Sequence, residues 1–172
     1  MMAVSKHFGG AVPVSAVCAT AEAADRAVAN AYFATRSHAT DPMLCAAGSA
    51  SIEVIVEERL PERAARIGDR IKAAFVEMAR EFELVGDIRG RGVLLGIELV
   101  ADRESRVPVD AAAKAMLEHC ERSGLILQLR GSGGHRNVLR LVPPMSTSDD
   151  DVDRALDILR DGIAKAITAA GE

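Results

Sequence analysis

The sequence is poor in aromatic residues, which make up 3% of its 172 residues, and it has no tryptophan. Hydrophobic residues still make up 49% of the chain, so the sequence predicts a real but aliphatic core. A dense block of lysine and arginine is also missing, and the formal net charge is −4. This charge pattern argues against a nucleic-acid-binding surface.

Cysteine is scarce, and the three cysteines are Cys18, Cys45 and Cys120. Their number is odd, they are widely spaced, and they form neither a Cys-x-x-Cys pair nor a metal-ligand pattern. We expect small buried thiols in a reducing compartment, and therefore a cytoplasmic protein. The sequence shows no signal-peptide pattern and no apolar run of about 18 residues, so we expect no insertion into a membrane.

Residues 1–42 have the pattern of the end of an α/β domain. Met2–Ser5 predicts the end of a strand, and the nearly all-apolar segment 12–20 predicts a second strand. Such strands are buried on both faces in parallel or mixed sheets that helices cover. Thr20 then precedes a short alanine-rich segment and predicts the N-cap of a helix over 21–28.

A lysine, Lys6, follows the first predicted strand and is itself followed by the glycine pair Gly9 and Gly10. A strand end holds a side chain rigidly, and glycines let a ligand approach the backbone closely. A lysine in a poorly hydrated site loses proton affinity and becomes an amine nucleophile for carbonyl chemistry. The local motif leaves a second interpretation open, which is a solvated lysine before a turn.

Residues 43–172 predict helices and short strands in alternation. We expect helices over 43–60, 61–82, 111–123 and 149–168, with small side chains over 46–51 and with Gly124 ending the third helix. The glycine-rich segment 85–100 predicts two strands around a tight turn, and further strands are expected at 125–129 and 138–141. We interpret this region as a small α+β domain with a three-stranded sheet and flanking helices.

Three segments carry a resemblance to a known family: Ser5–Gly10, Gly86–Glu98 with its Gly-Asp-Ile-Arg-Gly-Arg-Gly start, and Leu139–Pro144 with its Arg-Leu-Val-Pro-Pro run. In order and spacing they resemble the C-terminal portion of class III aminotransferases, which are pyridoxal-phosphate enzymes of fold type I. Within that class the chain looks most like 2,2-dialkylglycine decarboxylase and the 4-aminobutyrate-type aminotransferases. The segment Ser37–Pro42 favours the decarboxylase-like branch.

The resemblance implies a role for three residues. Lys6 matches the lysine that bonds covalently to pyridoxal phosphate and then moves protons at the substrate carbon. Ser37 matches a threonine whose hydroxyl binds the cofactor phosphate of the neighbouring subunit. Arg140 matches the arginine that binds the substrate carboxylate, for which a planar guanidinium is suited. Ser37, Ala39 and Asp41 are also candidate ligands for an alkali cation, as in the decarboxylase-like relatives.

Each of these residues also has a purely structural interpretation. Ser37 fits a simple turn hydroxyl, and Arg140 fits a surface charge on a short strand. We interpret Arg89 and Arg91, which lie between glycines, as turn and domain-packing residues. The four histidines form no pattern of metal ligands.

Members of the class are more than twice as long as this chain, so we expect a C-terminal fragment. Residues 1–42 would be a remnant of the large pyridoxal-phosphate-binding α/β domain, and 43–172 the small C-terminal domain with its connecting helix. The resemblance implies transamination, or decarboxylating transamination, of an amino acid with a 2-oxo acid acceptor. It also implies a homodimer or a complementing N-terminal chain, without which we expect no activity. The alternative is a non-catalytic α+β interaction or oligomerisation module derived from such an enzyme.

Overall fold

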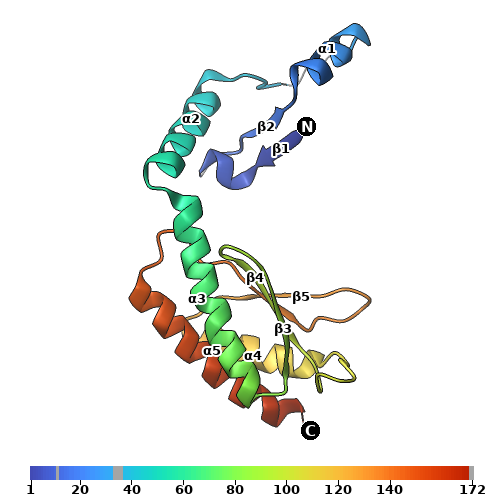
Figure 1. Ribbon diagram of the computed structural model, residues 1–172, viewed down its shortest axis with the longest axis vertical. Coiled ribbons are helices and arrows are strands. Elements are labelled where there is room, and N and C mark those ends of the chain that lie inside the picture. Colours follow the sequence, from blue (N-terminus) through green and yellow to red (C-terminus); the bar gives the residue numbers. More distant parts are fainter. Residues whose placement is uncertain (11, 33–36, 171–172) are drawn as a thin grey trace. The chain divides into compact units, whose positions relative to one another are not determined.

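The computed structural model describes residues 1–10, 12–32 and 37–170 and divides the chain into two compact units, Met1–Leu60 and Pro61–Glu172 (Figure 1). In the described part of the chain, no helix has both the length and the apolar character needed to cross a membrane.

The first unit begins with a two-stranded antiparallel sheet. Strand β1 (Met2–Ser5) leads into the 3-10 helix η1 (Lys6–Gly9) and pairs with β2 (Ser15–Cys18), with Met2 opposite Cys18. The expected strand over 12–20 is therefore shorter, and it is not buried on both faces here, since Val17 is 67% exposed. The expected helix follows as α1 (Ala21–Ala29), with the Thr20 hydroxyl accepting from the backbone N–H of Ala23.

Helix α2 (Pro42–Glu57) completes the first unit. It packs on η1, where a Cβ at the buried Gly48 would lie 3.5 Å from the Phe8 ring. The small side chains over 46–51 thus permit a close helix contact, as expected. This contact places α2 with the N-terminal elements, so the compact units divide after Leu60 and not at residue 42. The assignment of 1–42 and 43–172 to the two domains of a longer enzyme stays a prediction.

The second unit has three helices on one face of a four-stranded antiparallel sheet (Figure 1). Its elements are α3 (Leu60–Glu81), β3 (Val85–Arg91), β4 (Leu94–Leu99), α4 (Asp110–Arg122), β5 (Gln128–Arg130), β6 (Val138–Leu141) and α5 (Asp149–Ala170). The strand order is β3-β4-β6-β5. The sheet has four strands and not the three expected, because both strands of the predicted hairpin join β5 and β6 in one sheet.

Side chains alternate between the two faces of this sheet. The inner face packs on the helices and is aliphatic; its buried members include Leu95, Ile97, Leu99, Leu139 and Leu141. Four buried residues of α3 repeat at helical spacing against it: Ile67, Ile71, Phe75 and Met78. The outer face carries the alternate residues, which are mostly polar.

The three cysteines do not share one environment. Cys120, on α4, is fully buried, whereas Cys18 and Cys45 are exposed. The expectation of three buried thiols is therefore wrong for two of them. Both exposed cysteines belong to the first unit, in which Gly9 and Gly48 are the buried residues among those described.

Candidate active site

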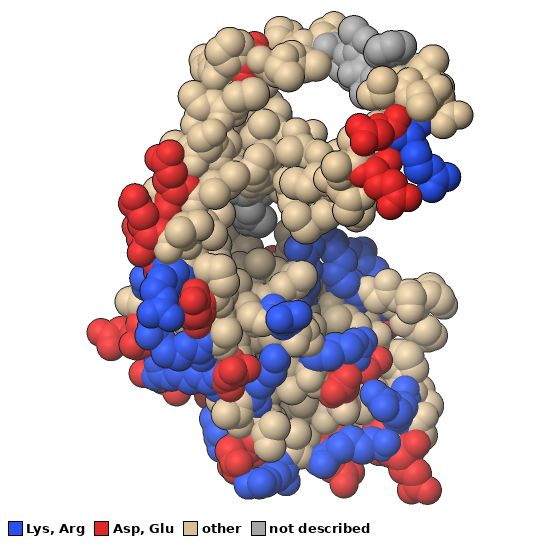
Figure 2. Space-filling view, turned by 45° about the horizontal axis from the view of Figure 1, so that its top comes forward, with Lys and Arg blue, Asp and Glu red and all other residues tan. Residues whose placement is uncertain are grey.

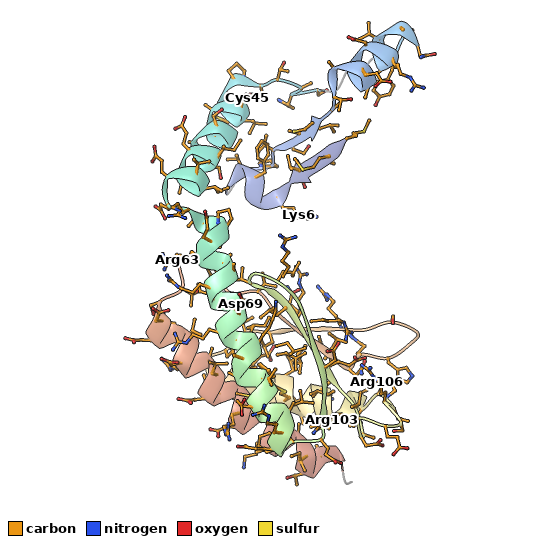
Figure 3. The ribbon with its side chains drawn as sticks, viewed as in Figure 1. Lys6, Cys45, Arg63, Asp69, Arg103 and Arg106 are labelled. Carbon is orange, nitrogen blue, oxygen red and sulfur yellow. The ribbon has the colours of Figure 1, made fainter. Side chains whose placement is uncertain are left out.

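Lys6 stands at the junction of β1 and η1, and its side chain is exposed (Figure 3). Its backbone has φ 63°, in the left-handed region that non-glycine residues seldom adopt. Such backbone strain persists only where the surrounding structure imposes it, and it is concentrated at functional sites. The strand end therefore presents Lys6 in an imposed backbone conformation, but its side chain is exposed and does not lie in a poorly hydrated site here, so its catalytic role stays a prediction.

The glycines after Lys6 have different roles. Gly9 is buried, and a Cβ there would lie 2.3 Å from Cγ1 of Val14, which is far too close. Gly10 has φ 63° and begins the turn back toward β2. The space beside Gly9 is thus occupied by the chain's own Val14, which constrains the backbone between η1 and β2.

Ser37 lies in an exposed turn over 37–40 that leads into α2. His38 and Thr40 in this turn both have a positive φ, 63° and 59°. The Asp41 carboxylate caps α2 by accepting from the backbone N–H of Met43 at 3.0 Å. Asp41 also contacts the His38 ring at 3.4 Å. The hydroxyl of Ser37 is accessible, but its role as a phosphate ligand and the cation site at Ser37, Ala39 and Asp41 remain predictions.

Arg140 is on β6, with its side chain on the outer face of the second unit's sheet. It stands opposite Gly96 of β4 and Gln128 of β5. Gly96 has no side chain, which leaves room for a guanidinium beside it. Nη1 of Arg140 donates to Oε1 of Gln128 at 3.5 Å, while Nε is buried and has no hydrogen-bond partner among the described residues. Gln128 was not indicated by the sequence, because only the strand register brings it beside Arg140.

A second charged cluster joins β3 and β4 to Arg106 of the loop after β4. Arg89 donates to Asp87 at 2.9 Å and to Glu98 at 2.8 Å, and Arg106 donates to Glu98 at 3.3 Å. The hydrogen bond from Arg89 lowers the pKa of Glu98 below its ordinary value, and Arg106 adds to this effect. Arg89 is thus neutralised within its own hairpin, which agrees with a packing role.

The three predicted residues divide between the units: Lys6 and Ser37 belong to the first, and Arg140 to the second. Among the described residues, no group of three or more His, Cys, Asp or Glu side chains is arranged to hold a metal ion. The chemistry available is therefore that of an exposed amine, a hydroxyl and a guanidinium without a carboxylate partner among the described residues.

Comparison with known proteins identifies relatives along nearly the whole chain. The family described as "Aminotransferase class-III" matches residues 1–163. Alanine--glyoxylate aminotransferase 2 of Pongo abelii is 35% identical over 167 residues, covering 96% of this chain and 32% of its own length. A probable 4-aminobutyrate aminotransferase of Bacillus subtilis is 34% identical over 163 residues, covering 95% of this chain and 36% of its own length.

A solved structure gives the fold. An amine transaminase from an uncultivated Pseudomonas species, in its PLP-bound form, has a TM-score of 0.83 and is 21% identical, covering 95% of this chain and 38% of that one. The chain spans about a third of the length of the curated relatives it matches. The described units therefore correspond to a part of the fold type I transaminase fold, and the chain belongs to the class III aminotransferase family.

Proposed function

We propose that this chain is the C-terminal part of a pyridoxal-phosphate-dependent transaminase, or decarboxylating transaminase, that acts on amino acids with a 2-oxo acid acceptor. The observation that carries the proposal is the exposed Lys6 amine in a left-handed backbone conformation at the end of β1. The family match over residues 1–163, which includes Lys6 and Arg140, supports it.

The residues present fit part of a cofactor site. Lys6 supplies a primary amine that is free to bond with an aldehyde, and the exposed Ser37 hydroxyl would bind the phosphate across a dimer interface. When bound, pyridoxal phosphate supplies an electron-withdrawing ring that stabilises negative charge at the substrate carbon. Lys6 Nζ would then move a proton at that carbon, and Arg140 would orient the substrate through its carboxylate.

The chain is proposed to need a complementing N-terminal polypeptide, or a longer chain of the same kind, before it is active. Its relatives are about three times as long. Fixed contacts to the ring and phosphate provide most of the binding free energy of a cofactor, so we expect the rest of such a protein to supply them. We place the assembled enzyme in the cytoplasm as a dimer. An alkali cation at Ser37, Ala39 and Asp41 would accompany the decarboxylating version of the reaction.

Cofactor labelling tests this proposal. The 172-residue chain is incubated with pyridoxal phosphate and reduced with borohydride, and the labelled lysines are then located by mass spectrometry. We expect weak labelling spread over Lys6 and other lysines, because Lys6 alone does not hold the cofactor in place. Adding the N-terminal two-thirds of the Bacillus subtilis relative should concentrate the label on Lys6, whereas Lys114→Ala, a control on α4, should leave that label unchanged. Tight, stoichiometric labelling of Lys6 in the chain alone would contradict the need for a partner.

Turnover by the complemented protein identifies the reaction. Alanine, 4-aminobutyrate and 2-methylalanine serve as donors, with pyruvate or 2-oxoglutarate as acceptors. Release of carbon dioxide from 2-methylalanine would assign decarboxylation, whereas amino transfer from alanine or 4-aminobutyrate without such release would assign simple transamination. Lys6→Ala should abolish either reaction, and turnover that survives this substitution would remove Lys6 from its proposed role.

A non-catalytic interaction module is the second candidate. It is favoured by the second unit, which has a continuous aliphatic core of its own formed by α3, α4, α5 and the sheet. Under this function, complementation would restore neither selective labelling nor turnover.

A further inference from the structure

The outer face of the second unit's sheet carries arginines in different electrostatic settings. On β3 and β4, the Arg89 guanidinium is neutralised by the carboxylates of Asp87 and Glu98. On β5 and β6, the arginines are Arg130 and Arg140, and among the described residues neither has a carboxylate within ion-pair distance. Arg89 is therefore balanced by carboxylates, whereas Arg130 and Arg140, like Arg91 at the end of β3, have no carboxylate partner among the described residues.

One neutral side chain lies between Arg130 and Arg140. Oε1 of Gln128 accepts from Nη2 of Arg130 at 3.0 Å and from Nη1 of Arg140 at 3.5 Å. The strand register enforces this arrangement, since Gln128 is directly opposite Arg140 and two residues from Arg130 on the same strand face. Both guanidinium groups thus donate to the same amide oxygen, which holds them close together.

This arrangement is electrostatically incomplete. The Nε of Arg140 has lost water without gaining a partner among the described residues, and a buried donor without a partner is unfavourable. The two like charges also repel each other, and an amide oxygen offsets less of this repulsion than a carboxylate would. An anion bound between the two guanidiniums would offset their repulsion.

We propose that Arg130, Gln128 and Arg140 form one anion site, in which Arg130 is a second cation and Gln128 is a positioning residue for both guanidiniums. The site then binds a small dicarboxylate in preference to a monocarboxylate. This inference rests on the proposed role of Arg140 in binding a carboxylate, and it adds a chemical class for the acceptor, namely a 2-oxo acid with a second carboxylate.

Direct binding to the full 172-residue chain tests the inference without any turnover. Arginine is labelled with ¹⁵N, and the Nε–Hε signals of Arg130 and Arg140 are followed during titration with succinate and with acetate at equal ionic strength. We expect succinate to bind about tenfold more tightly than acetate, as one added charge-assisted contact predicts.

Variants separate the contributions of the three residues. Arg130→Gln should reduce the preference for succinate to about twofold or less while acetate binding persists, because one cation is lost. Gln128→Glu should weaken both anions about tenfold or more, because its carboxylate would occupy both guanidiniums. Arg154→Gln, on an exposed position of α5, is the matched control and should change neither value.

The outcomes distinguish this inference from the proposed function. If Arg140→Gln abolishes binding but Arg130→Gln leaves the preference for succinate unchanged, Arg130 is not part of the site and the inference is wrong, while the role of Arg140 stands. If the wild-type signals respond to neither anion, both fail. If Arg154→Gln lost the preference for succinate as much as Arg130→Gln, the change in overall charge would explain the loss. The inference would then also be wrong.

Discussion

Burial gives Cys120 a different reactivity from the other two cysteines. Its side chain is fully buried in the core of the second unit. Desolvation, with a smaller contribution from the charge of Glu121, raises the pKa of its thiol to about 11. The thiolate, which is the reactive form, is therefore rare at neutral pH.

We predict that iodoacetamide alkylates Cys18 and Cys45 in the folded chain but not Cys120. Cys120 is protected because reagent cannot reach it and because its thiolate is rare, whereas the other two cysteines are exposed. Mass spectrometry of peptides after a timed reaction measures this, with the chain in urea as the control in which all three react. Alkylation of Cys120 as fast as Cys45 in the folded state would show that α4 does not pack as described.

The pair Arg89–Glu98 should make stability depend on pH. The pKa of Glu98 is lowered in the folded state. Its contribution to the free energy of unfolding is therefore complete above the ordinary carboxyl pKa of 4.5, and it is lost as the pH falls through the pKa of the folded state. The pair is partly exposed, so we expect a contribution of only about 0.2–1 kcal/mol.

We predict that Glu98→Gln lowers the free energy of unfolding at neutral pH and has little effect at acidic pH, where the wild-type carboxylate is itself protonated. Urea denaturation at several pH values measures the difference. In an Arg89→Gln background most of the effect of Glu98→Gln should disappear. An unchanged effect in that background would mean that Arg89 is not the partner that matters.

At the scale of elements, α3 and the β3–β4 turn approach each other through two glycines. A Cβ at Gly68 of α3 would lie 2.0 Å from the carbonyl oxygen of Gly92. The contact is with backbone, which cannot rotate away as a side chain would. Gly92 itself has φ 54°, as the turn between the two strands requires.

We predict that Gly68→Ala destabilises the second unit by about 1–3 kcal/mol, although alanine favours a helix by about 1 kcal/mol over glycine. Gly162→Ala on α5 is the matched comparison. A Cβ there would lie 3.2 Å from the Sγ of Cys120 and the Cγ of Met116, which are side-chain and not backbone atoms, so its cost should be smaller. Urea denaturation of both variants measures this, and a more stable Gly68→Ala would contradict the close approach of α3 to the turn.

At the scale of the whole molecule, the first unit exposes much apolar surface. Its large exposed hydrophobic side chains include Val17, Val28, Met43, Val56 and Met2. In Figure 2, charged side chains gather mainly over the second unit, while most of the visible surface of the first is uncharged. Large exposed apolar patches mark interfaces or sites of aggregation, and two-stranded sheets have unpaired edges.

We predict that residues 1–172 self-associate or need a partner to remain dispersed, and that a chain of residues 60–172 behaves as a monomer. The shorter chain retains the core of α3, α4, α5 and the sheet. Size-exclusion chromatography with light scattering on both chains measures the association. A monodisperse, stable monomer of the full chain would show that the apolar surface of the first unit is not an interface.

The sequence itself determined the class, the order of elements and most of their bounds. Helical spacing identified α3, and local signals fixed the ends of others, since Thr20 caps α1 and Gly124, with φ 90°, follows α4. These features depend on residues a few positions apart, so a linear sequence displays them. Lys6 was indicated in the same way, by the strand and the glycines beside it, but its role stays a prediction.

Only the tertiary structure decided which distant residues meet. The order β3-β4-β6-β5, the contact of Gly68 with Gly92, and the position of Gln128 between Arg130 and Arg140 all depend on strand register and helix placement. A register is selected by the burial of one whole sheet face, and no local pattern encodes it. For the same reason the sequence did not reveal that Cys120 is buried while Cys18 and Cys45 are exposed.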